Sequence, residues 1–396
     1  MTRSRIDEMI CRQEGLTALT EETIRLVQLH KLNGLLRRER ERGGLYSHLP
    51  EQLHSLDELA ALPFTTDEQL AHRAPSMLLV SQRDVQRVLS DATSGTSGAA
   101  KRVFYTAADC ERTVELFMAG LGELVFPGSV TVICMPFSGP YGLGELIAEA
   151  ITRLGARPVK AGAGKSFGEM KSILEKEQPD TFVGMPVQLL SLLRYCGRGS
   201  LRRALVSADA CPETVMGECE NLLGSRLFPH YGSREMALGG AICCPAHEGM
   251  HLRENHVIAE IIDENGNVLP KGETGELVIT TIGMEALPLI RYRTGDYTRI
   301  LPEKCPCGSP VLRLDAVHRL DDRMEKLDGA LFKLPGLIDC RMDEGGELSA
   351  LTDGALTEAQ IRTRGDFRSV TIKKADDSDR PLYIGKRRII QQTSSI

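Results

Sequence analysis

A run of small, mostly hydroxylated residues is the part of this chain best suited to binding an anion. Lys101 follows shortly after this run, whose six residues are Thr93, Ser94, Gly95, Thr96, Ser97 and Gly98. The glycines allow positive φ angles and a close approach of the backbone, so that N–H groups and hydroxyls can surround a phosphate. Lys101 would add a positive charge at the exit of the loop. The alternative interpretation is a flexible surface loop rich in serine and glycine.

A Gly-Lys-Ser sequence at 164–166 invites the same interpretation, but its context argues against it. A Walker phosphate-binding loop requires a glycine at position 159, where this chain has Val159. Ser166 and Glu169 are instead spaced as in a capping box, which predicts that a helix begins after Ser166 and runs towards Glu177. We therefore do not expect this segment to bind a nucleotide.

The elements that must position the hydroxylated loop are predicted from apolar periodicity. Short apolar runs typical of buried strands lie at 130–135, 157–159, 181–186 and 205–208. Helical periodicity separates them, at 107–124, 167–177 and 187–195. This alternation predicts an α/β fold with a largely parallel sheet.

From about residue 256 the pattern becomes β-rich. Apolar residues at 256–262 and 275–281 flank a turn and predict a hairpin. Residues 345–354 contain several glycines and are predicted to form a loop. We expect a large layered N-terminal domain with mixed sheets and a β-rich subdomain.

The length, composition and net charge of the chain limit the class of protein to which it can belong. The chain has 396 residues, of which 42% are hydrophobic and 26% charged, and a formal net charge of −6. It can bury a large core in two or more domains. The acidic balance argues against a nucleic-acid partner, and no apolar run of about 18 residues could span a membrane. We expect a cytoplasmic protein without a membrane partner, and a homodimer remains an open alternative.

Three further stretches reveal a resemblance to a known family. They are His-Tyr-Gly-Ser-Arg-Glu at 230–235, Arg-Tyr-Arg-Thr-Gly-Asp at 291–296 and Arg-Leu-Asp-Asp at 319–322. Together with the loop at 93–98, their order and spacing resemble the acyl-adenylate-forming superfamily of acyl-CoA synthetases, peptide-synthetase adenylation domains and luciferases. Leu-Pro-Phe-Thr-Thr at 62–66 and the stretch 285–296 are similar to the phenylacetate–CoA ligase branch. The resemblance covers roughly residues 15–340.

The resemblance implies a site for ATP and Mg²⁺. Activating a carboxylate with ATP brings two anions together, so the site needs donors and a metal ion around the triphosphate. The loop and Lys101 would hold the β- and γ-phosphates, Glu235 would hold Mg²⁺, and Asp296 would bind the ribose hydroxyls. The other residues implied for the nucleotide are Ser207, Ala208, Asp209, Tyr231, Gly232, Ser233 and Arg319. Taken singly, Glu235 or Asp296 could equally be a solvated loop carboxylate.

The resemblance also implies a small α+β C-terminal domain that swings about a hinge and delivers a lysine to adenylation. Residues 317–322 match the hinge, with His318 where glycine is usual, and we expect domains at 1–318 and 319–396. Lys386 is the candidate catalytic lysine, because its charge would stabilise the bond being formed. The alternative for Gly-Lys-Arg-Arg at 385–388 is a solvated basic tail. The C-terminal part is shorter than usual, which places CoA thioester formation in more doubt than adenylation.

Two half-sites predict a structural Zn²⁺. Cys244 and His251 form one, and Cys305 and Cys307 form the other. Thiolates and imidazole suit tetrahedral zinc. Cys243 and His247 are alternates, and ordinary reduced thiols are the alternative interpretation. The remaining cysteines include five that we expect to behave as small buried hydrophobic residues, namely Cys110, Cys134, Cys196, Cys211 and Cys219.

These expectations combine into an ATP-dependent carboxylic acid–CoA ligase that forms an acyl-AMP, with the acid, ATP and CoA as its small-molecule partners. The branch resemblance suggests an aryl acid. Its pocket is expected near four residues, Phe137, Tyr141, Gly239 and Gly240. Two alternatives stay open: an adenylating enzyme that loads a carrier-protein thiol, and a non-catalytic nucleotide-binding protein with a degenerate C-terminal domain.

Overall fold

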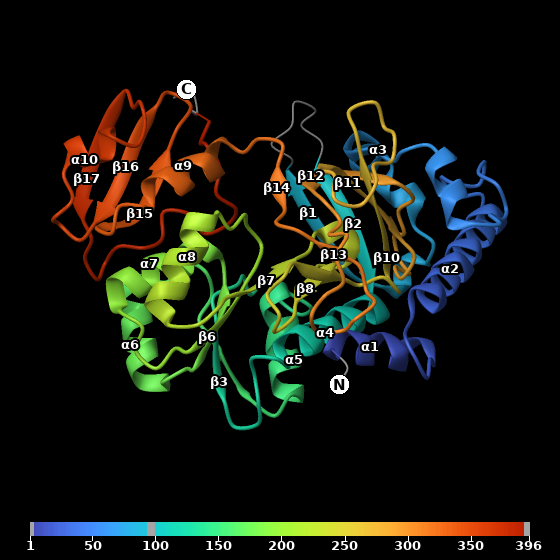
Figure 1. Cartoon of the computed structure of the whole chain (residues 1–396), viewed down its shortest axis with the longest axis horizontal. Helices are drawn as coiled ribbons and strands as arrows, with labels where there is room; N and C mark the ends of the chain where they lie inside the picture. The colour runs from blue at the N-terminus through green and yellow to red at the C-terminus, as the bar shows by residue number, and fades with distance from the viewer. Residues whose placement is uncertain (1–3, 93–99, 392–396) are drawn as a thin grey trace. The chain divides into compact units, whose positions relative to one another are not determined.

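The computed structural model of the chain describes residues 4–92 and 100–391. It has a mixed α/β fold with several sheets, which confirms the predicted fold class (Figure 1). The chain divides into two compact units. The first comprises Met1–Glu123 and His230–Leu320, and the second comprises Leu124–Pro229 and Asp321–Ile396. Each unit is therefore built from two separate stretches of sequence.

The first unit begins with helices that lead into an antiparallel strand pair. Its helices before residue 124 are α1 (Arg5–Glu14), α2 (Glu21–Arg42), η1 (Leu56–Ala61), α3 (Asp67–Arg73), η2 (Ala74–Met77), η3 (Gln82–Asp84) and α4 (Ala107–Leu121). β1 (Val85–Ala92) pairs with β2 (Ala100–Thr106). The predicted phosphate-binding residues 93–98 lie between these two strands, outside the described residues.

A capping box fixes the start of α3. The Thr66 hydroxyl accepts a hydrogen bond from the N–H of Gln69 at 3.3 Å, and the Gln69 side chain accepts one from the N–H of Thr66 at 2.9 Å. This cap makes Asp67 the first residue of the helix, where the positive end of the helix dipole favours a carboxylate.

The rest of the first unit is β-rich, as predicted. Its elements are the second half of β7 (Phe228–Tyr231), η4 (Arg234–Met236), β8 (Ala241–Cys243), β9 (Met250–Leu252), β10 (Val257–Ile262), β11 (Gly275–Thr281), β12 (Tyr292–Thr298), β13 (Arg313–Leu314) and β14 (His318–Arg319). One sheet has the order β10-β11-β12-β14, and its antiparallel β10–β11 pair confirms the predicted hairpin. The other strands follow the order β13-β9-β8-β7, also antiparallel.

In the second unit, strands and helices alternate over residues 124–229. The elements are β3 (Val130–Ile133), α5 (Leu143–Arg153), β4 (Arg157–Lys160), α6 (Phe167–Glu177), β5 (Thr181–Gly184), α7 (Pro186–Cys196), β6 (Arg203–Val206) and α8 (Glu213–Leu223). The strands pair in parallel in the order β6-β5-β3-β4, and the first half of β7 extends the sheet beside β6. The predicted parallel sheet is confirmed.

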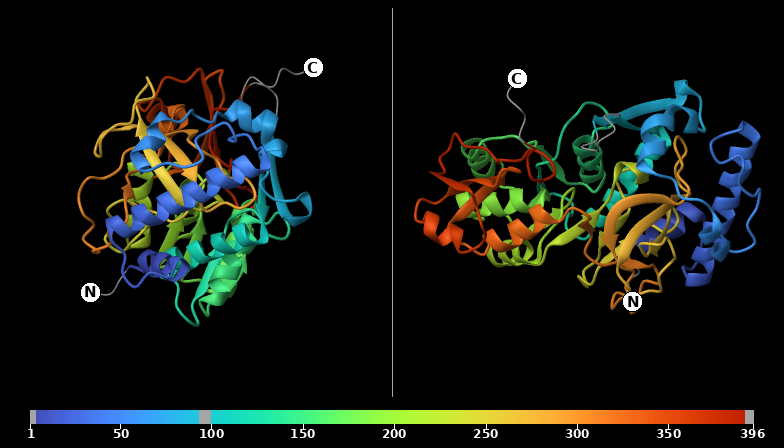
Figure 2. Two further views of the ribbon diagram at one scale, coloured as in Figure 1. Left: turned by 90° about the vertical axis from the view of Figure 1, so that its right-hand side faces the viewer. Right: turned by 90° about the horizontal axis from the view of Figure 1, so that it is seen from above.

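The C-terminal stretch packs within this second unit. It contains α9 (Arg323–Leu331), β15 (Leu337–Met342), β16 (Glu347–Thr352), α10 (Glu358–Arg362) and β17 (Ser369–Lys374). Its sheet, β15-β16-β17, lies beside α7 in Figure 1 and in the right-hand view of Figure 2, and β15 packs against α7. Leu190 of α7 and Val215 of α8 share one hydrophobic core with Leu331, Phe332 and Leu337.

The prediction of a loop at 345–354 is wrong, because β16 occupies most of it. Leu348, Ala350 and Leu351 are buried in that strand. The glycines bound the strand rather than interrupt it: Gly346 (φ 77°) and Gly354 (φ 93°) sit at its two ends. Both adopt positive φ angles, which glycine accepts without steric cost.

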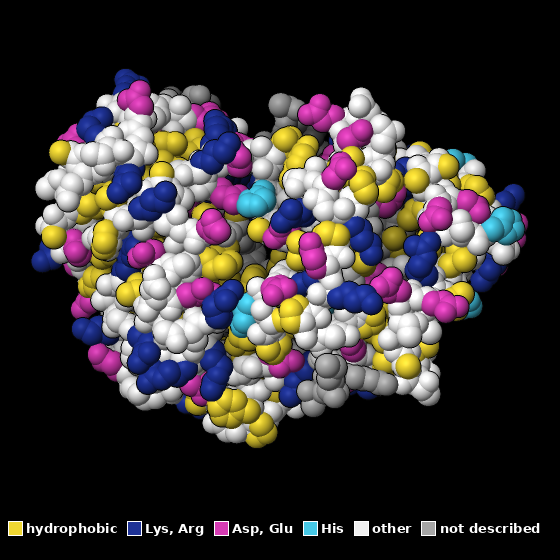
Figure 3. Space-filling view, in the orientation of Figure 1, with side chains coloured by type: hydrophobic (Ala, Val, Ile, Leu, Met, Phe, Trp, Pro, Cys, Tyr) yellow, Lys and Arg dark blue, Asp and Glu magenta, His cyan; other side chains and the backbone are white. Residues whose placement is uncertain are grey.

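The surface in Figure 3 carries basic and acidic side chains interspersed over the visible face. The formal net charge of the chain is −6. Among the helices that the structure describes, none is long and apolar enough to cross a membrane. The eleven cysteines are all free thiols in this structure.

Candidate active site and metal centre

In the first unit, a lysine ammonium lies between two carboxylates and a phenol. Lys101 on β2 places its Nζ 3.0 Å from both carboxylate oxygens of Asp67 and 3.3 Å from Oε1 of Glu235. The same Nζ lies 3.2 Å from the hydroxyl of Tyr292, which in turn lies within hydrogen-bond distance of both carboxylates. Glu235 belongs to η4, whose N-cap is Ser233, one of the residues predicted for the nucleotide.

Burial and charge pairing act against each other on these groups. Burial is the largest influence on Glu235 and would raise its pKa, but the charge of Lys101 together with hydrogen bonds from Ser233, Lys101 and the Glu235 backbone holds that pKa below its ordinary value. Burial would also lower the pKa of Lys101, yet Glu235 and Asp67 raise it overall. Glu235, with its side chain only 10% exposed, is therefore an ionised carboxylate at neutral pH. Ionised carboxylates are the side-chain ligands that Mg²⁺ prefers.

A second cluster of polar side chains lies where β7, β12 and β14 meet. The hydroxyl of Tyr231 donates to Oδ2 of Asp296 at 2.8 Å. Asp296 lies directly opposite Arg319 in the antiparallel β12–β14 pair. Opposed residues in such a pair have their Cβ atoms about 4.5–5.5 Å apart. The structure thus brings together three of the residues predicted for the nucleotide.

The glycines after β7 are closely packed. A Cβ atom on Gly232 would meet the backbone of Leu238. A Cβ atom on Gly239 would run into Leu116, and one on Gly240 into Met236. Two of the four residues predicted for the acid pocket, Gly239 and Gly240, are therefore buried against protein atoms.

The other two residues predicted for the acid pocket, Phe137 and Tyr141, lie before α5 in the second unit. The ammonium of Lys160 lies 5.8 Å from the centre of the Phe137 ring. Tyr141 is 37% exposed and has a φ of 63°. A positive φ is uncommon for a bulky residue and marks a turn or a strained site.

The segment predicted to line adenine follows β6 in the second unit. Ser207 is buried, and Ala208 has a φ of 71°, a left-handed conformation that costs a residue with a Cβ roughly 1–2 kcal/mol. Oδ2 of Asp209 accepts a hydrogen bond from the N–H of Arg387 at 2.8 Å. Arg387 follows the candidate lysine, Lys386, so the two segments lie side by side within this unit.

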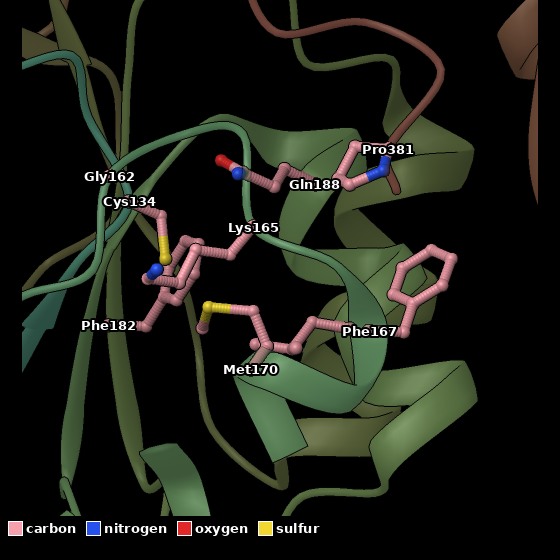
Figure 4. A pocket seen from close by; sticks show the side chains of 9 residues that line it. Cys134, Gly162, Lys165, Phe167, Met170, Phe182, Gln188 and Pro381 are labelled. Atoms are coloured by element: carbon pink, nitrogen blue, oxygen red, sulfur yellow. The ribbon is translucent and has the colours of Figure 1, made fainter. Parts of the chain in front are cut away.

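The Gly-Lys-Ser segment at 164–166 is confirmed as a helix start. Ser166 caps α6 in a capping box with Glu169. The nearby cavity, drawn in Figure 4, is lined by Gly162, Lys165 and Phe182 among others and measures only about 10 Å³. A space of that size holds about one water molecule. It does not accommodate a nucleotide.

Three cysteines and a histidine form a compact cluster in the first unit. The ligand atoms of Cys244, His251, Cys305 and Cys307 all lie within 4.8 Å of one another. Sγ of Cys244 is 3.6 Å from Sγ of Cys305, and Sγ of Cys307 is 3.4 Å from Nε2 of His251. These separations are within about 0.2 Å of the edges of a zinc tetrahedron, about 3.5–3.8 Å for bonds of about 2.3 Å to sulfur and about 2.0 Å to nitrogen.

The donor set also fits zinc chemically. Burial lowers the pKa of His251 to about 4, so its imidazole is neutral at physiological pH and able to coordinate a metal. The two alternates are not part of this cluster: Sγ of Cys243 instead lies 3.8 Å from Nδ1 of His247. The residues present therefore fit a four-ligand zinc site.

Sequence reasoning missed two members of the Lys101 cluster, Asp67 and Tyr292. The sequence did point to their neighbourhood: Asp67 follows the stretch 62–66 and Tyr292 lies within 285–296, the two stretches that are similar to the phenylacetate–CoA ligase branch. The structure joins these stretches: the N–H of Thr65 donates to Arg291 O at 2.9 Å, and the N–H of Arg293 donates to Thr65 O at 3.0 Å. These bonds place Asp67 beside Tyr292.

Comparison with known proteins identifies the class. Residues 88–285 match the family described as AMP-binding enzyme. The fold is similar to the crystal structure of 2-hydroxyisobutyryl-CoA ligase in the postadenylation state in complex with R3-HIB-AMP, with a TM-score of 0.73 and 19% sequence identity. That match covers 94% of this chain and 90% of the other. The chain belongs to the AMP-binding enzyme family, in its group of AMP-forming acid–CoA ligases.

Curated relatives narrow the comparison. The phenylacetate-coenzyme A ligase of Pseudomonas putida is 31% identical over 359 residues, which covers 85% of this chain and 78% of the relative. The phenylacetate-coenzyme A ligase of Thermus thermophilus is 29% identical over 387 residues, or 88% of this chain and 83% of the relative. The resemblance inferred from the sequence motifs is confirmed.

Proposed function

We propose that this protein joins a carboxylic acid to CoA in two steps. The carboxylate attacks the α-phosphate of ATP and displaces pyrophosphate, which gives an acyl-AMP. The thiol of CoA then attacks the acyl carbon and displaces AMP. The observation that carries this proposal is the buried, ionised Glu235 beside Lys101, in a chain of the AMP-binding family.

In the first unit, each polar group has a proposed task. Glu235 holds Mg²⁺, which when bound neutralises charge on the phosphates. Lys101, now the counter-ion of Glu235, is proposed to bind the β- and γ-phosphates together with the loop at 93–98. Asp296 accepts the ribose hydroxyls, and Tyr231 positions it by a hydrogen bond and lies against adenine.

In the second unit, Ser207, Ala208 and Asp209 are proposed to line the other side of adenine. Lys386 is the proposed catalytic lysine of adenylation, since an exposed ammonium can approach the charge that develops on the α-phosphate and carboxylate. We also propose that residues 319–396 swing between the adenylation step and the thioester-forming step.

The proposed acid is aromatic. The curated relatives named above are ligases of phenylacetate. Phe137 and Tyr141 are the aromatic candidates for contact with such a ring.

The cluster of Cys244, His251, Cys305 and Cys307 is proposed to hold one structural Zn²⁺. Four protein ligands complete the tetrahedron and leave no position for water or substrate. The ion would tie the turn after β8 to the turn before β13.

A screen of carboxylic acids tests the proposal. We expect ATP-dependent release of pyrophosphate with one or more aryl acids, and release of AMP that depends on CoA. If pyrophosphate is released but AMP release does not depend on CoA, the result would favour transfer of the acyl group to a carrier-protein thiol. ATP binding without any acid-dependent pyrophosphate would favour the non-catalytic alternative.

A further inference from the structure

The residue after the candidate lysine is a buried arginine in an ion-pair cluster. The Arg387 side chain is only 7% exposed. Its Nε and Nη2 donate to the two oxygens of Asp328 at 2.7 Å each, and its Nη1 donates to Oδ1 of Asp339 at 2.8 Å. Nη2 also donates to the carbonyl of Cys340 at 2.8 Å. A bidentate pair of this kind fixes the position and the plane of the guanidinium.

Residues of β15 tie down both ends of the segment 382–390, which we name the lysine loop. At its start, the N–H of Leu382 donates to Oδ2 of Asp339 at 2.7 Å. At its end, the N–H of Ile390 donates to the carbonyl of Met342 at 3.0 Å. Asp339 therefore holds both Arg387 and the first residue of the loop.

Lys386 is exposed at the tip of this loop, between these fixed points. The Arg387 guanidinium lies 4.7 Å from the centre of the Tyr383 ring. The Tyr383 hydroxyl donates to the carbonyl of Arg388 at 2.7 Å, which closes the loop around Lys386. Lys386 thus projects from a short loop whose base is held in place by ion pairs and hydrogen bonds.

One further contact links the lysine loop to the segment proposed to line adenine. The N–H of Arg387 donates to Oδ2 of Asp209 at 2.8 Å. The side chain of Arg387 faces α9 and β15, whereas its backbone faces Asp209. The same residue therefore anchors the loop to the C-terminal elements and docks it against the β6 side of the unit.

We propose that Arg387 is a positioning residue for adenylation: its pairs with Asp328 and Asp339 hold the lysine loop, and its bond to Asp209 sets where Lys386 is presented. This inference rests on the proposed role of Lys386. A displacement of a catalytic group by about 1 Å can cost on the order of 10²-fold in rate. An arginine can span two carboxylates with its planar fork, whereas a lysine has a single point charge.

The test compares Arg387→Lys with Arg388→Lys. The first variant keeps the charge, so Asp328 and Asp339 are not left unneutralised, but it loses the bidentate geometry. Arg388 is an exposed neighbour, and its side chain makes no ion pair with any residue that the structure describes. Single-turnover formation of acyl-AMP, followed by mass spectrometry, is measured with the acid found in the screen, in the wild-type and Lys386→Ala backgrounds.

We expect Arg387→Lys to slow acyl-AMP formation at saturating ATP by about tenfold or more, with the affinity for ATP unchanged. Arg388→Lys should change it less than twofold. In the Lys386→Ala background, Arg387→Lys should have almost no further effect, because it acts through the lysine. Thioester formation from added acyl-AMP and CoA should stay at the wild-type rate.

Each other outcome overturns the proposal. If Lys386→Ala slows acyl-AMP formation but Arg387→Lys does not, Arg387 does not position the lysine. The proposed function would stand in that case. An equal loss in both backgrounds would show a general structural effect of Arg387. If Lys386→Ala forms acyl-AMP at the wild-type rate, both the role of Lys386 and the inference about Arg387 fail.

Discussion

In the Lys101 cluster, the protonation state of a side chain depends on its burial and on the charged groups beside it. Glu235 is buried, a setting that favours the neutral carboxyl group, and the ammonium of Lys101 together with hydrogen bonds from Ser233 and the backbone keeps it ionised. Tyr292 contributes a hydroxyl to the same cluster, and burial together with the carboxylates raises its pKa far above the ordinary value. The phenol therefore stays protonated and acts as a donor.

Replacing Lys101 by methionine should reveal this pairing in the pH dependence of stability. The pKa of Glu235 is held low in the folded protein, so the pairing stabilises the fold above the unfolded pKa and is lost as pH falls through the folded value. Lys101→Met should cost roughly 1–3 kcal/mol of unfolding free energy at pH 7. The cost should shrink below about pH 4. Urea denaturation at both pH values measures it, with Lys101→Arg as the control that keeps the charge. A cost independent of pH would contradict the assignment.

Asp296 offers a test of nucleotide binding itself. A carboxylate that accepts both ribose hydroxyls contributes to binding before and during the reaction, so Asp296→Ala should weaken ATP affinity by roughly 1.5–3 kcal/mol for each charge-assisted bond lost. Tyr231→Phe removes only the hydroxyl that donates to Asp296 and should have a smaller effect. Titration calorimetry distinguishes the two variants. Unchanged affinity in Asp296→Ala would make Asp296 an ordinary surface acid.

The sequence predicted some members of these clusters and missed others for a physical reason. Glu235 and Asp296 stand in recognisable motifs. Asp67 and Tyr292 acquire a role only because folding brings them to Lys101, which lies 34 residues from Asp67 and 191 from Tyr292 in sequence. Both lie in or next to the stretches that resemble the branch, but a local pattern does not show which distant residues will pair.

At the scale of elements, periodicity was a good guide wherever a segment buries one face or both. β3, β5 and the β10–β11 hairpin follow their apolar patterns. β16 was missed because its flanking glycines suggested a loop. Those glycines bound the strand, since positive φ angles are needed where the chain turns at its ends.

The proposed zinc site connects two elements, and its loss should be visible in both metal content and stability. Purified protein should contain about one Zn²⁺ per chain. Cys305→Ser should remove it and lower the melting temperature by roughly 5 °C or more, because the ion joins turns 61 residues apart. Cys243→Ser, at a neighbouring cysteine outside the cluster, should keep the zinc. Protein purified without a tag and found free of zinc would make these residues ordinary thiols.

The turn after β6 carries backbone strain that a substitution can release. Ala208→Gly should leave the unfolding free energy unchanged or raise it by up to about 1 kcal/mol, because relief of roughly 1–2 kcal/mol exceeds the entropy that glycine adds to the unfolded chain. Ala208→Val should be destabilising, since a β-branched residue fits a positive φ poorly. Ala204→Gly, buried in the adjacent strand, is the control and should destabilise. Thermal unfolding separates these cases, and a clear loss in Ala208→Gly would mean that the methyl group is needed there.

At the scale of the whole molecule, both compact units are discontinuous in sequence. The chain leaves the first unit after Glu123, returns to it at His230, and leaves again after Leu320. The sequence suggested domains at 1–318 and 319–396 from a motif, and that division stays a prediction. What the sequence did not reveal is that the last stretch shares a hydrophobic core with α7 and α8, since shared burial depends on long-range packing.

This shared core leads to a prediction about truncation. Arg194 on α7, with its side chain only 5% exposed, donates to the carbonyls of Phe332, Leu334 and Leu337. A chain ending at Leu320 would leave this buried guanidinium without those acceptors and would expose the apolar face of α7 and α8. Exposed apolar surface costs about 25 cal/mol per Å². The truncated protein should therefore lose cooperative unfolding of the second unit and aggregate.

A chain ending at Gln391 is the matched control and should melt at the full-length temperature. Calorimetry and light scattering compare the two truncations. The prediction is wrong if the chain ending at Leu320 stays soluble, with one sharp transition close to that of the full-length protein. That result would mean that the core between α7, α8 and the C-terminal elements contributes little to stability.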